Sequence, residues 1–200
     1  AMVVSTFHSA CARFLRRDAD LLGYTKTFAI YDQTDALSLL KRVIESLDYD
    51  PKVHKPRTVL TAISNAKNEL LTPEQFAARA SNYAERVQSE IYADYQNRLR
   101  VANAMDFDDL ISNMVRLLRE HPEVAARYRA NFRHIMVDEY QDTNVAQYEL
   151  IRELVGIGGE APLAELCVVG DADQSIYAFR GATIRNIDEF ERDFPAATTI

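Results

Sequence analysis

Apolar residues in the first half of the chain recur at intervals of three and four positions, which is the period of an amphipathic helix. The pattern predicts helices over residues 8–22, 32–47 and 57–70. Before them, the β-branched run Val3–Thr6 is expected to be the end of a buried strand. This part of the chain is therefore predicted to be one strand followed by several helices.

A fourth helix is predicted to start at Thr72 and to continue to about Asn103. Thr72 is a suitable cap, Pro73 fits the first helical turn, and Gln75 completes a capping box. Charges alternate along the segment that follows, and aromatic residues are frequent in it. Residues 24–104 are therefore predicted to be an all-helical block.

In the second half of the chain, short apolar runs alternate with helical patterns. Strands are expected at residues 134–138, 166–169 and 198–200, and helices at 106–120, 122–132, 145–155 and 184–194. Such alternation is typical of a parallel α/β sheet with connecting helices. Since the helical block interrupts this pattern, we interpret it as an insertion into an α/β core.

The composition fits a globular protein with a hydrophobic core. The 200 residues are 48% hydrophobic and 26% charged, with 6 glycines and 6 prolines, so collagen-like and low-complexity classes are excluded. The formal net charge of −7 argues against a histone-like protein that binds nucleic acid through a basic tail. Binding of nucleic acid in one local groove stays compatible with this charge.

Cysteine usage and hydropathy bear on the compartment. Cys11 and Cys167 are far apart in the sequence and have no cluster of histidine or cysteine ligands around them, so neither a disulfide scaffold nor a zinc site is expected. The apolar runs are too short to cross a bilayer, and no signal peptide is visible. A reducing, cytoplasmic location without a membrane partner is therefore expected.

The segment Val137–Asn144 places two carboxylates directly after a predicted strand. In a parallel sheet, ligands gather at the carboxyl ends of the strands. There Asp138 can hold Mg²⁺, and Glu139 can orient and deprotonate an attacking water. Gln141 is an uncharged hydrogen-bonding group that could report the state of a γ-phosphate. For an Asp-Glu pair in isolation, the alternative is a solvated strand end or a cap for the next helix.

A second polar loop follows the strand predicted at residues 166–169. Gln174 in this loop could touch a terminal phosphate. Tyr177 and Phe179 precede Arg180, and aromatic faces beside a guanidinium suit the stacking of unpaired bases. The alternative is that the two aromatic residues belong to the core and that the arginine is a surface cation.

Four segments together resemble superfamily 1 DNA helicases of the UvrD/PcrA/Rep type. They are Ser5–Ser9, similar to motif Ia; Asp106–Leu110, similar to the segment that re-enters the core after the inserted domain; Asp138–Asn144, similar to motif II; and Gly170–Gly181, similar to motif III. The resemblance covers most of the chain and preserves the order of the motifs.

The resemblance implies an α/β fold in which part of a RecA-like parallel sheet, of the P-loop NTPase class, carries an all-helical inserted subdomain. In the family the RecA-like part is called domain 1A, which here would consist of residues 1–23 and 105–200. The insert, called subdomain 1B, would be residues 24–104. The family places 1B near the duplex, which makes its small basic loop a further candidate contact: Lys52, His54, Lys55 and Arg57.

Carried over residue by residue, the resemblance also implies roles. Asp138 would bind Mg²⁺, Glu139 would be the catalytic base, and Gln174 would contact the γ-phosphate of ATP. The side chains implied to contact single-stranded DNA are Phe7, Tyr177, Phe179 and Arg180, with Thr6 and His8 near its phosphates. Many relatives carry Trp where this chain has Phe179, which offers a smaller stacking face.

The family's nucleotide site begins with a glycine-rich P-loop that ends in Gly-Lys-Thr or Gly-Lys-Ser and precedes motif Ia. The 200 residues contain no such segment, nor the motifs and arginine fingers of the second motor domain. We therefore expect an internal fragment that by itself neither hydrolyses ATP nor unwinds DNA. Its sheet is expected to have an exposed edge through which copies associate.

For the parent protein, the resemblance implies ATP- and Mg²⁺-dependent movement along single-stranded DNA in the 3′ to 5′ direction. It also implies unwinding at junctions of single-stranded and duplex DNA, in DNA repair and with repair proteins as partners. The alternative class is a non-catalytic module, in which the RecA-like scaffold or the helical insert docks DNA or protein.

Overall fold

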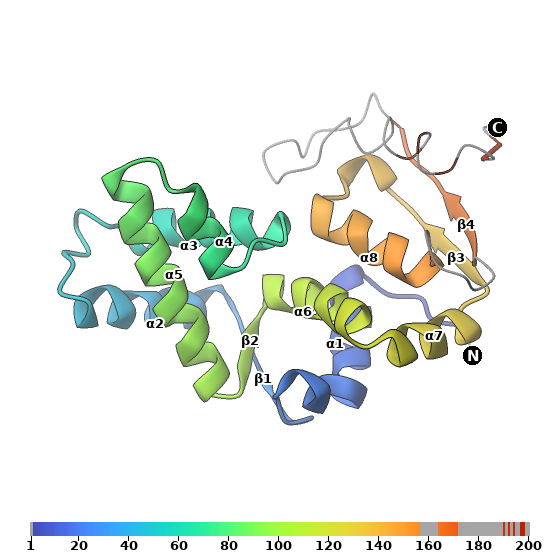
Figure 1. The fold of residues 1–200 in the computed structure, drawn as a ribbon, viewed down its shortest axis with the longest axis horizontal. Coiled ribbons are helices and arrows are strands. Elements are labelled where there is room, and N and C mark those ends of the chain that lie inside the picture. The colour runs from blue at the N-terminus through green and yellow to red at the C-terminus, as the bar shows by residue number, and fades with distance from the viewer. Residues whose placement is uncertain are drawn as a thin grey trace. The chain divides into compact units, whose positions relative to one another are not determined.

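The computed structural model describes residues 2–156 and 164–171 and the single positions 190, 192, 194, 197 and 198. The chain forms two compact units, Ala1–Met114 and Val115–Ile200 (Figure 1). The helix predicted at 184–194 and the strand predicted at 198–200 lie outside the described residues, apart from single positions. None of the described helices combines the length and the apolar character needed to cross a membrane.

The first unit opens with α1 (Phe7–Asp18) and the short helical turn η1 (Ala19–Leu22). The Thr6 hydroxyl caps α1 by accepting a backbone N–H of the first turn. Gly23 ends η1 with a φ of 81°, in the left-handed region that glycine adopts without strain. The helical prediction for residues 8–22 is thereby confirmed.

The strand predicted at Val3–Thr6 is wrong. Residues 2–6 adopt no regular secondary structure, and Val4 is 82% exposed. No strand within the described part of the chain pairs with this segment. β-branched side chains favour an extended backbone, but a strand also needs ladder hydrogen bonds to a neighbour.

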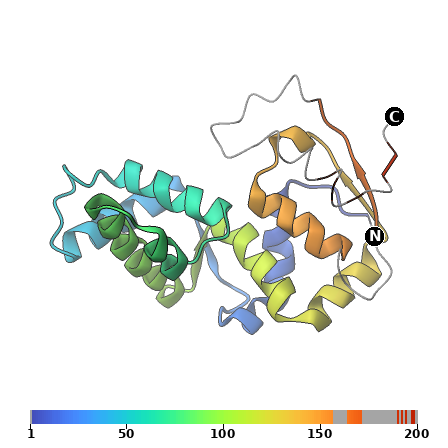
Figure 2. The ribbon, with the colours of Figure 1, turned by 45° about the horizontal axis from the view of Figure 1, so that its top comes forward.

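Four helices make up most of the first unit: α2 (Gln33–Ser46), α3 (Pro56–Asn68), α4 (Pro73–Arg79) and α5 (Tyr83–Val101). They pack on one another (Figure 2). Their shared core includes Leu40, Ile44, Ile63, Ile91, Tyr95 and Leu99. The helices predicted at 32–47 and 57–70 are confirmed.

The long helix predicted from Thr72 is in fact divided into α4 and α5. Ala80 leaves the helical region with a ψ of 115°, and Asn82 caps α5 by accepting the backbone N–H of Glu85. The Glu85 carboxylate accepts in return from both the backbone and the hydroxyl of Ser81. Because the Asn82 and Glu85 side chains accept backbone N–H groups locally, a new helix starts where the charge pattern alone suggests continuity.

Two short strands at the ends of the helical block were not predicted. β1 (Ala29–Tyr31) and β2 (Ala104–Asp106) pair in parallel, with Ala29 opposite Ala104. Next to them, the Asn103 side chain accepts from the backbone N–H of Thr25 at 2.8 Å and donates to its hydroxyl at 2.6 Å. The chain therefore enters and leaves the helical block at adjacent positions, as an insertion does.

Helix α6 (Phe107–Glu120) follows β2 without a loop and continues into the second unit. That unit then contains α7 (Pro122–Asn131), β3 (His134–Val137), the helical turn η2 (Tyr140–Asp142), α8 (Val145–Val155) and β4 (Glu165–Val168). Arg119 of α6 forms ion pairs with Glu149 and Glu153 of α8. The elements predicted at 106–120, 122–132, 134–138, 145–155 and 166–169 are confirmed in type and place.

β3 and β4 pair in parallel, with Met136 opposite Cys167 and Val137 opposite Val168. The run at residues 134–138 suggests a buried strand that ends in charge, but only the end of β3 is buried, and Met136 is 76% exposed. Alternate residues of a strand point to opposite faces of the sheet. Within the described residues, the face that carries Met136 and Cys167 is not covered.

Candidate functional site

The two predicted catalytic carboxylates lie at the carboxyl end of β3. Val137 is buried, and Asp138 and Glu139 after it are exposed. Glu139 has a φ of 52° and a ψ of 43°, which is the left-handed region and is uncommon for a residue other than glycine. Its backbone N–H donates to Asp138 Oδ1 at 3.0 Å. The backbone thus turns sharply at Glu139 and leaves both carboxylates at the surface.

The loops after β3 and β4 are joined by backbone hydrogen bonds. The Val169 N–H donates to the Val137 carbonyl at 2.8 Å, and the Tyr140 N–H donates to the Val169 carbonyl at 2.9 Å. The pairing of the strands therefore continues beyond their ends. Residues of the two loops are held next to each other, as expected for the carboxyl edge of a parallel sheet.

Gln141 bridges these two loops with its side-chain amide. Its Nε2 donates to Glu139 Oε2 at 2.6 Å, and its Oε1 accepts the backbone N–H of Asp171 at 3.1 Å. The residue is only 3% exposed. Sequence reasoning selected Gln141 as a group near a γ-phosphate but did not detect its burial or its bond to Asp171.

Helix α8 is capped without help from the carboxylates. Asn144 accepts the backbone N–H of Gln147, and the Gln147 side chain accepts the backbone N–H of Asn144, which is a complete capping box. Asp138 and Glu139 are therefore not the cap of this helix. The explanation that the pair caps the next helix is therefore excluded, and the remaining structural alternative to a catalytic role is a solvated strand end.

The exposed carboxylates fit Mg²⁺ better than a metal that needs a closed protein site. Mg²⁺ keeps several waters and takes one or two carboxylates together with phosphate oxygens. Asp138, the residue implied to bind Mg²⁺, supplies an exposed carboxylate of this kind. No group of three or more His, Cys, Asp or Glu side chains in the described part of the chain could hold a metal ion.

In the first unit, the candidate DNA residues lie at the start of α1. Thr6 is exposed and caps the helix, and Phe7 and His8 are half-buried. The ring of His8 packs edge-on against Phe107, with centroids 5.9 Å apart. Burial lowers the pKa of His8 below its ordinary value, so the ring is uncharged at neutral pH.

Phe107 is a candidate that sequence reasoning missed. It is the first residue of α6 and is 50% exposed, although α6 is otherwise strongly amphipathic. Phe107 precedes the buried Leu110 and Ile111 by three and four positions, so its spacing places it on the apolar stripe and no signal in the sequence indicates its exposure. Phe107, His8 in contact with it, and Phe7 next to His8 in the sequence are called the aromatic strip of the first unit below.

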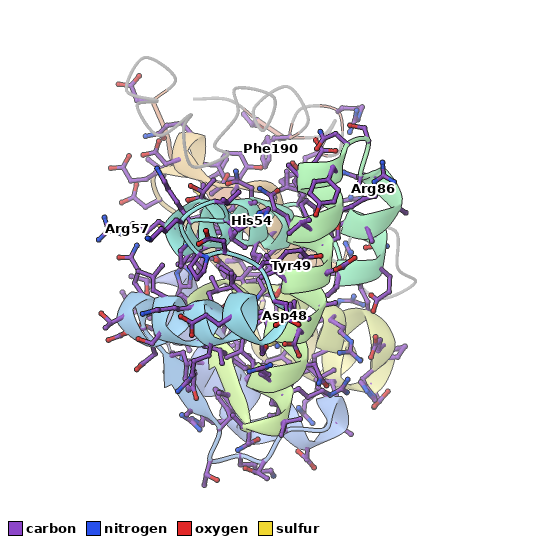
Figure 3. All side chains as sticks on the ribbon, turned by 90° about the vertical axis from the view of Figure 1, so that its left-hand side faces the viewer. Asp48, Tyr49, His54, Arg57, Arg86 and Phe190 are labelled. Carbon is purple, nitrogen blue, oxygen red and sulfur yellow. The ribbon has the colours of Figure 1, made fainter. Side chains whose placement is uncertain are left out.

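The remaining predicted phosphate and DNA contacts are partly outside the described residues and partly in the basic segment at residues 52–57. Gln174, Tyr177, Phe179 and Arg180 lie outside the described residues. Lys52 and Lys55, between α2 and α3, are exposed, as is Arg57 in the first turn of α3, and Figure 3 shows the Arg57 side chain projecting outward. His54 instead packs edge-on against Tyr49, with ring centroids 5.2 Å apart.

A buried ionic cluster of Lys67, Tyr95, Asp106 and Asp109 supports the start of α6. Lys67 Nζ lies 2.7 Å from Asp106 Oδ2 and 2.8 Å from Asp109 Oδ1, and the Tyr95 hydroxyl donates to Asp106 at 2.9 Å. Asp106 and Asp109 also exchange backbone-to-side-chain hydrogen bonds as the capping box of α6. This cluster ties α3, α5 and β2 to the helix that begins with Phe107.

The cluster shifts the ionisation of its members. Burial lowers the pKa of Lys67, but the charges of Asp106 and Asp109 outweigh it and raise the pKa above its ordinary value. Burial, and then the charge of Asp106, raises the pKa of Asp109 to about 6. The same two causes raise the pKa of neighbouring Asp108 to about 6.

Asp108→Asn is expected to remove a pH-dependent part of the stability. Because the pKa of Asp108 is higher in the folded chain, the folded state holds more protons between about pH 4 and 6, and stability falls as the pH rises through this window. Relative to wild type, the variant should gain up to ~3 kcal/mol across that window. Urea unfolding of both chains at several pH values measures this difference, and a constant difference would contradict it.

The chain matches the family described as the UvrD/REP helicase N-terminal domain over residues 1–195. It belongs to this family, and its short parallel strands and helical block are those of a partial RecA-like domain with a helical insertion. The predicted family and fold class are thereby confirmed.

Among individual proteins, the chain is 53% identical over 209 residues to the ATP-dependent DNA helicase UvrD1 of Mycobacterium leprae (strain TN), covering 100% of this chain and 27% of that protein. It is 48% identical over 197 residues to the ATP-dependent DNA helicase PcrA of Bacillus subtilis (strain 168), covering 98% of this chain and 26% of that protein. The chain thus spans about a quarter of the length of these relatives.

Proposed function

We propose that the chain is part of an ATP-dependent DNA helicase that moves 3′ to 5′ along single-stranded DNA. The observation that carries this proposal is the exposed Asp138-Glu139 pair, fixed at the carboxyl edge of a parallel sheet within a chain of the helicase family. The relatives named above are ATP-dependent DNA helicases. A role in DNA repair and a cytoplasmic location complete the proposal.

In the proposed reaction, Glu139 orients and deprotonates the water that attacks the γ-phosphate of ATP. Asp138 holds Mg²⁺, which when bound neutralises charge on the phosphate oxygens. Gln174 contacts the γ-phosphate. The sharp turn at Glu139 and the hydrogen bond from Gln141 support this assignment, since they hold the Glu139 carboxylate at the surface in one place.

DNA binding is assigned to aromatic and cationic side chains. Single-stranded bases stack on Phe7 and Phe107 of the aromatic strip, with the Thr6 hydroxyl and His8 near a phosphate. Tyr177, Phe179 and Arg180 provide the second contact. The support for stacking is that the Phe7 ring is partly exposed and the Phe107 ring is 50% exposed.

The direction of unwinding tests the proposal as a whole. The full-length protein, with ATP and Mg²⁺, should unwind a duplex that carries a 3′ single-stranded tail and leave one with only a 5′ tail intact. Strand separation is followed by the release of a fluorescent strand. Unwinding of the 5′-tailed duplex alone, or of neither, contradicts the proposal and would favour the non-catalytic docking module.

Phe107→Ala is expected to weaken binding of single-stranded DNA by about 1–3 kcal/mol, the usual contribution of one stacked base. Tyr83→Ala is the matched control, because Tyr83 is an aromatic side chain of the same unit that is 69% exposed and outside the strip. Fluorescence anisotropy with a labelled oligonucleotide compares the two variants of the full-length protein. Equal affinities for both variants would remove Phe107 from the DNA site.

The 200 residues alone are proposed to be inactive, because they contain no Gly-Lys-Thr or Gly-Lys-Ser P-loop. They are also proposed to self-associate through an exposed edge of the sheet that contains β3 and β4. Sedimentation and an ATPase assay of this chain check both statements. ATP turnover that Glu139→Gln abolishes, or a strictly monomeric chain, would contradict them.

A further inference from the structure

The orientation of the Gln141 amide follows from its partners. The backbone N–H of Asp171 can only donate, so the amide atom that faces it at 3.1 Å must be the oxygen. The NH₂ group therefore faces Glu139, whose carboxylate oxygen accepts at 2.6 Å. Both ends of one neutral side chain are used, one on the proposed catalytic base and the other on the backbone of the second loop.

The Gln141 side chain approaches Gly170 so closely that there is no room for a Cβ atom there. A Cβ atom added at Gly170 would lie 2.6 Å from Gln141 Oε1 and 3.3 Å from the Gln141 backbone nitrogen. Any other residue at this position would push the amide away from the Asp171 N–H. The glycine that begins the second polar loop is therefore part of the same contact.

The backbone around Gln141 is fixed independently of its side chain. The Tyr140 N–H donates to the Val169 carbonyl, the Asp142 N–H to the Glu139 carbonyl, and the Thr143 hydroxyl to the Tyr140 carbonyl. These bonds hold the turn η2 against the end of β4. If the backbone of Gly170 and Asp171 moves, the turn η2 stays in place, and the Gln141 side chain moves with that backbone and shifts the Glu139 carboxylate.

We propose that Gln141 is a positioning residue that links the second polar loop to the catalytic base: Oε1 follows the Gly170–Asp171 backbone, and Nε2 sets the place of the Glu139 carboxylate. The inference rests on the proposed function, in which Glu139 activates water. The loop that starts at Gly170 continues in sequence to the candidate DNA contacts Tyr177, Phe179 and Arg180. Through Gln141, the position of the DNA-contacting loop can therefore affect Glu139, although Gln141 itself does not contact the phosphate.

This role predicts a particular kinetic signature in the full-length protein. Gln141→Met, which keeps the length and loses both hydrogen bonds, and Gly170→Ala, which displaces the amide, should each lower kcat for ATP hydrolysis roughly 10-fold to 100-fold, as expected for a lost bond to a charged group. KM for ATP should stay within about twofold, because ground-state binding is untouched. Gln147→Met is the control and should leave kcat unchanged, since the hydrogen bonds of Gln147 to described residues are those of the α8 capping box.

Combined variants test whether the effect runs through one link. If it does, Gln141→Met with Gly170→Ala should be no slower than the slower single variant, and neither should slow turnover further in a Glu139→Gln background. Effects that multiply overturn the inference, as does a raised KM with unchanged kcat, which would make Gln141 a direct phosphate ligand. Thermal unfolding checks folding; if Gln141→Met does not fold, Gln141→Asn, one methylene too short for both bonds, takes its place.

The failure of this inference can be separated from failure of the proposed function. If Glu139→Gln abolishes turnover and the Gln141 and Gly170 variants behave as wild type, the link is wrong and the base assignment stands. If Glu139→Gln retains turnover, the base assignment itself is wrong, and the inference falls with it.

Discussion

Lys67→Met is expected to lower the free energy of unfolding by about 3–5 kcal/mol, the usual cost of removing one partner from a buried ion pair. Lys67 is the cation between Asp106 and Asp109, at 2.7 and 2.8 Å, and all three side chains are buried. Methionine fills a similar volume but leaves two carboxylates buried without a counter-charge. Urea unfolding of the chain, followed by circular dichroism, measures the loss.

The pH dependence of this loss separates a charge effect from a packing effect. At pH 5 the defect should shrink, because burial and the charge of Asp106 raise the pKa of Asp109 to about 6 and much of this carboxyl is then neutral. Lys41→Met is the matched control: its ion pair with Glu45 is exposed and 3.9 Å long, so the loss should stay below about 1 kcal/mol. Equal losses for the two variants would show that the cluster does not stabilise the fold.

Glu139→Gln is expected to reduce ATP turnover by the full-length protein roughly 10²–10⁴-fold, the usual contribution of a general base. Glutamine keeps the size of the side chain and removes the group that takes the proton. Binding of single-stranded DNA should be retained, because the variant leaves the aromatic strip intact. Steady-state hydrolysis and DNA anisotropy on the same preparation measure both properties.

The control for this variant is Glu165→Gln on β4. Glu165 is an exposed carboxylate of the same sheet, paired with His134 at 2.8 Å, and has no proposed role in hydrolysis. Its variant should turn over ATP at the wild-type rate. If the two variants are equally active, Glu139 is not the base.

Local signals in the sequence predicted most helices. The capping boxes that start at Thr72 and Asn144 are formed in the structure, and Gly23 ends its helix in the left-handed conformation. These features act within a few residues of the chain, so a single sequence carries them. The parallel pairing of β3 with β4 also followed, because a strand, a helix and a second strand in succession favour it.

The errors arose where structure depends on distant partners. β1 and β2 are three residues each and pair across more than seventy positions, so no period is visible in either. Val3–Thr6 has the composition of a strand but no partner in the described part of the chain. The break between α4 and α5 is different, because it depends on local bonds among Ser81, Asn82 and Glu85 that the charge pattern does not reveal.

For the site, the sequence predicted positions but not contacts. Asp138 and Glu139 were identified because they follow a strand, which is a local property. The bond from Gln141 to Asp171, the contact of His8 with Phe107 and the burial of Lys67 all join segments distant in sequence. A lysine in an amphipathic helix is expected at the surface, so the buried ionic cluster could not be predicted from the sequence.

The central claim is that this chain belongs to a motor in which ATP hydrolysis depends on single-stranded DNA. The most direct test is the rate of ATP turnover by the full-length protein in the absence and presence of a saturating single-stranded oligonucleotide. The account predicts slow turnover alone and a several-fold increase with the oligonucleotide, lost in Glu139→Gln. No turnover under either condition, or a rate that the oligonucleotide does not change, would contradict it.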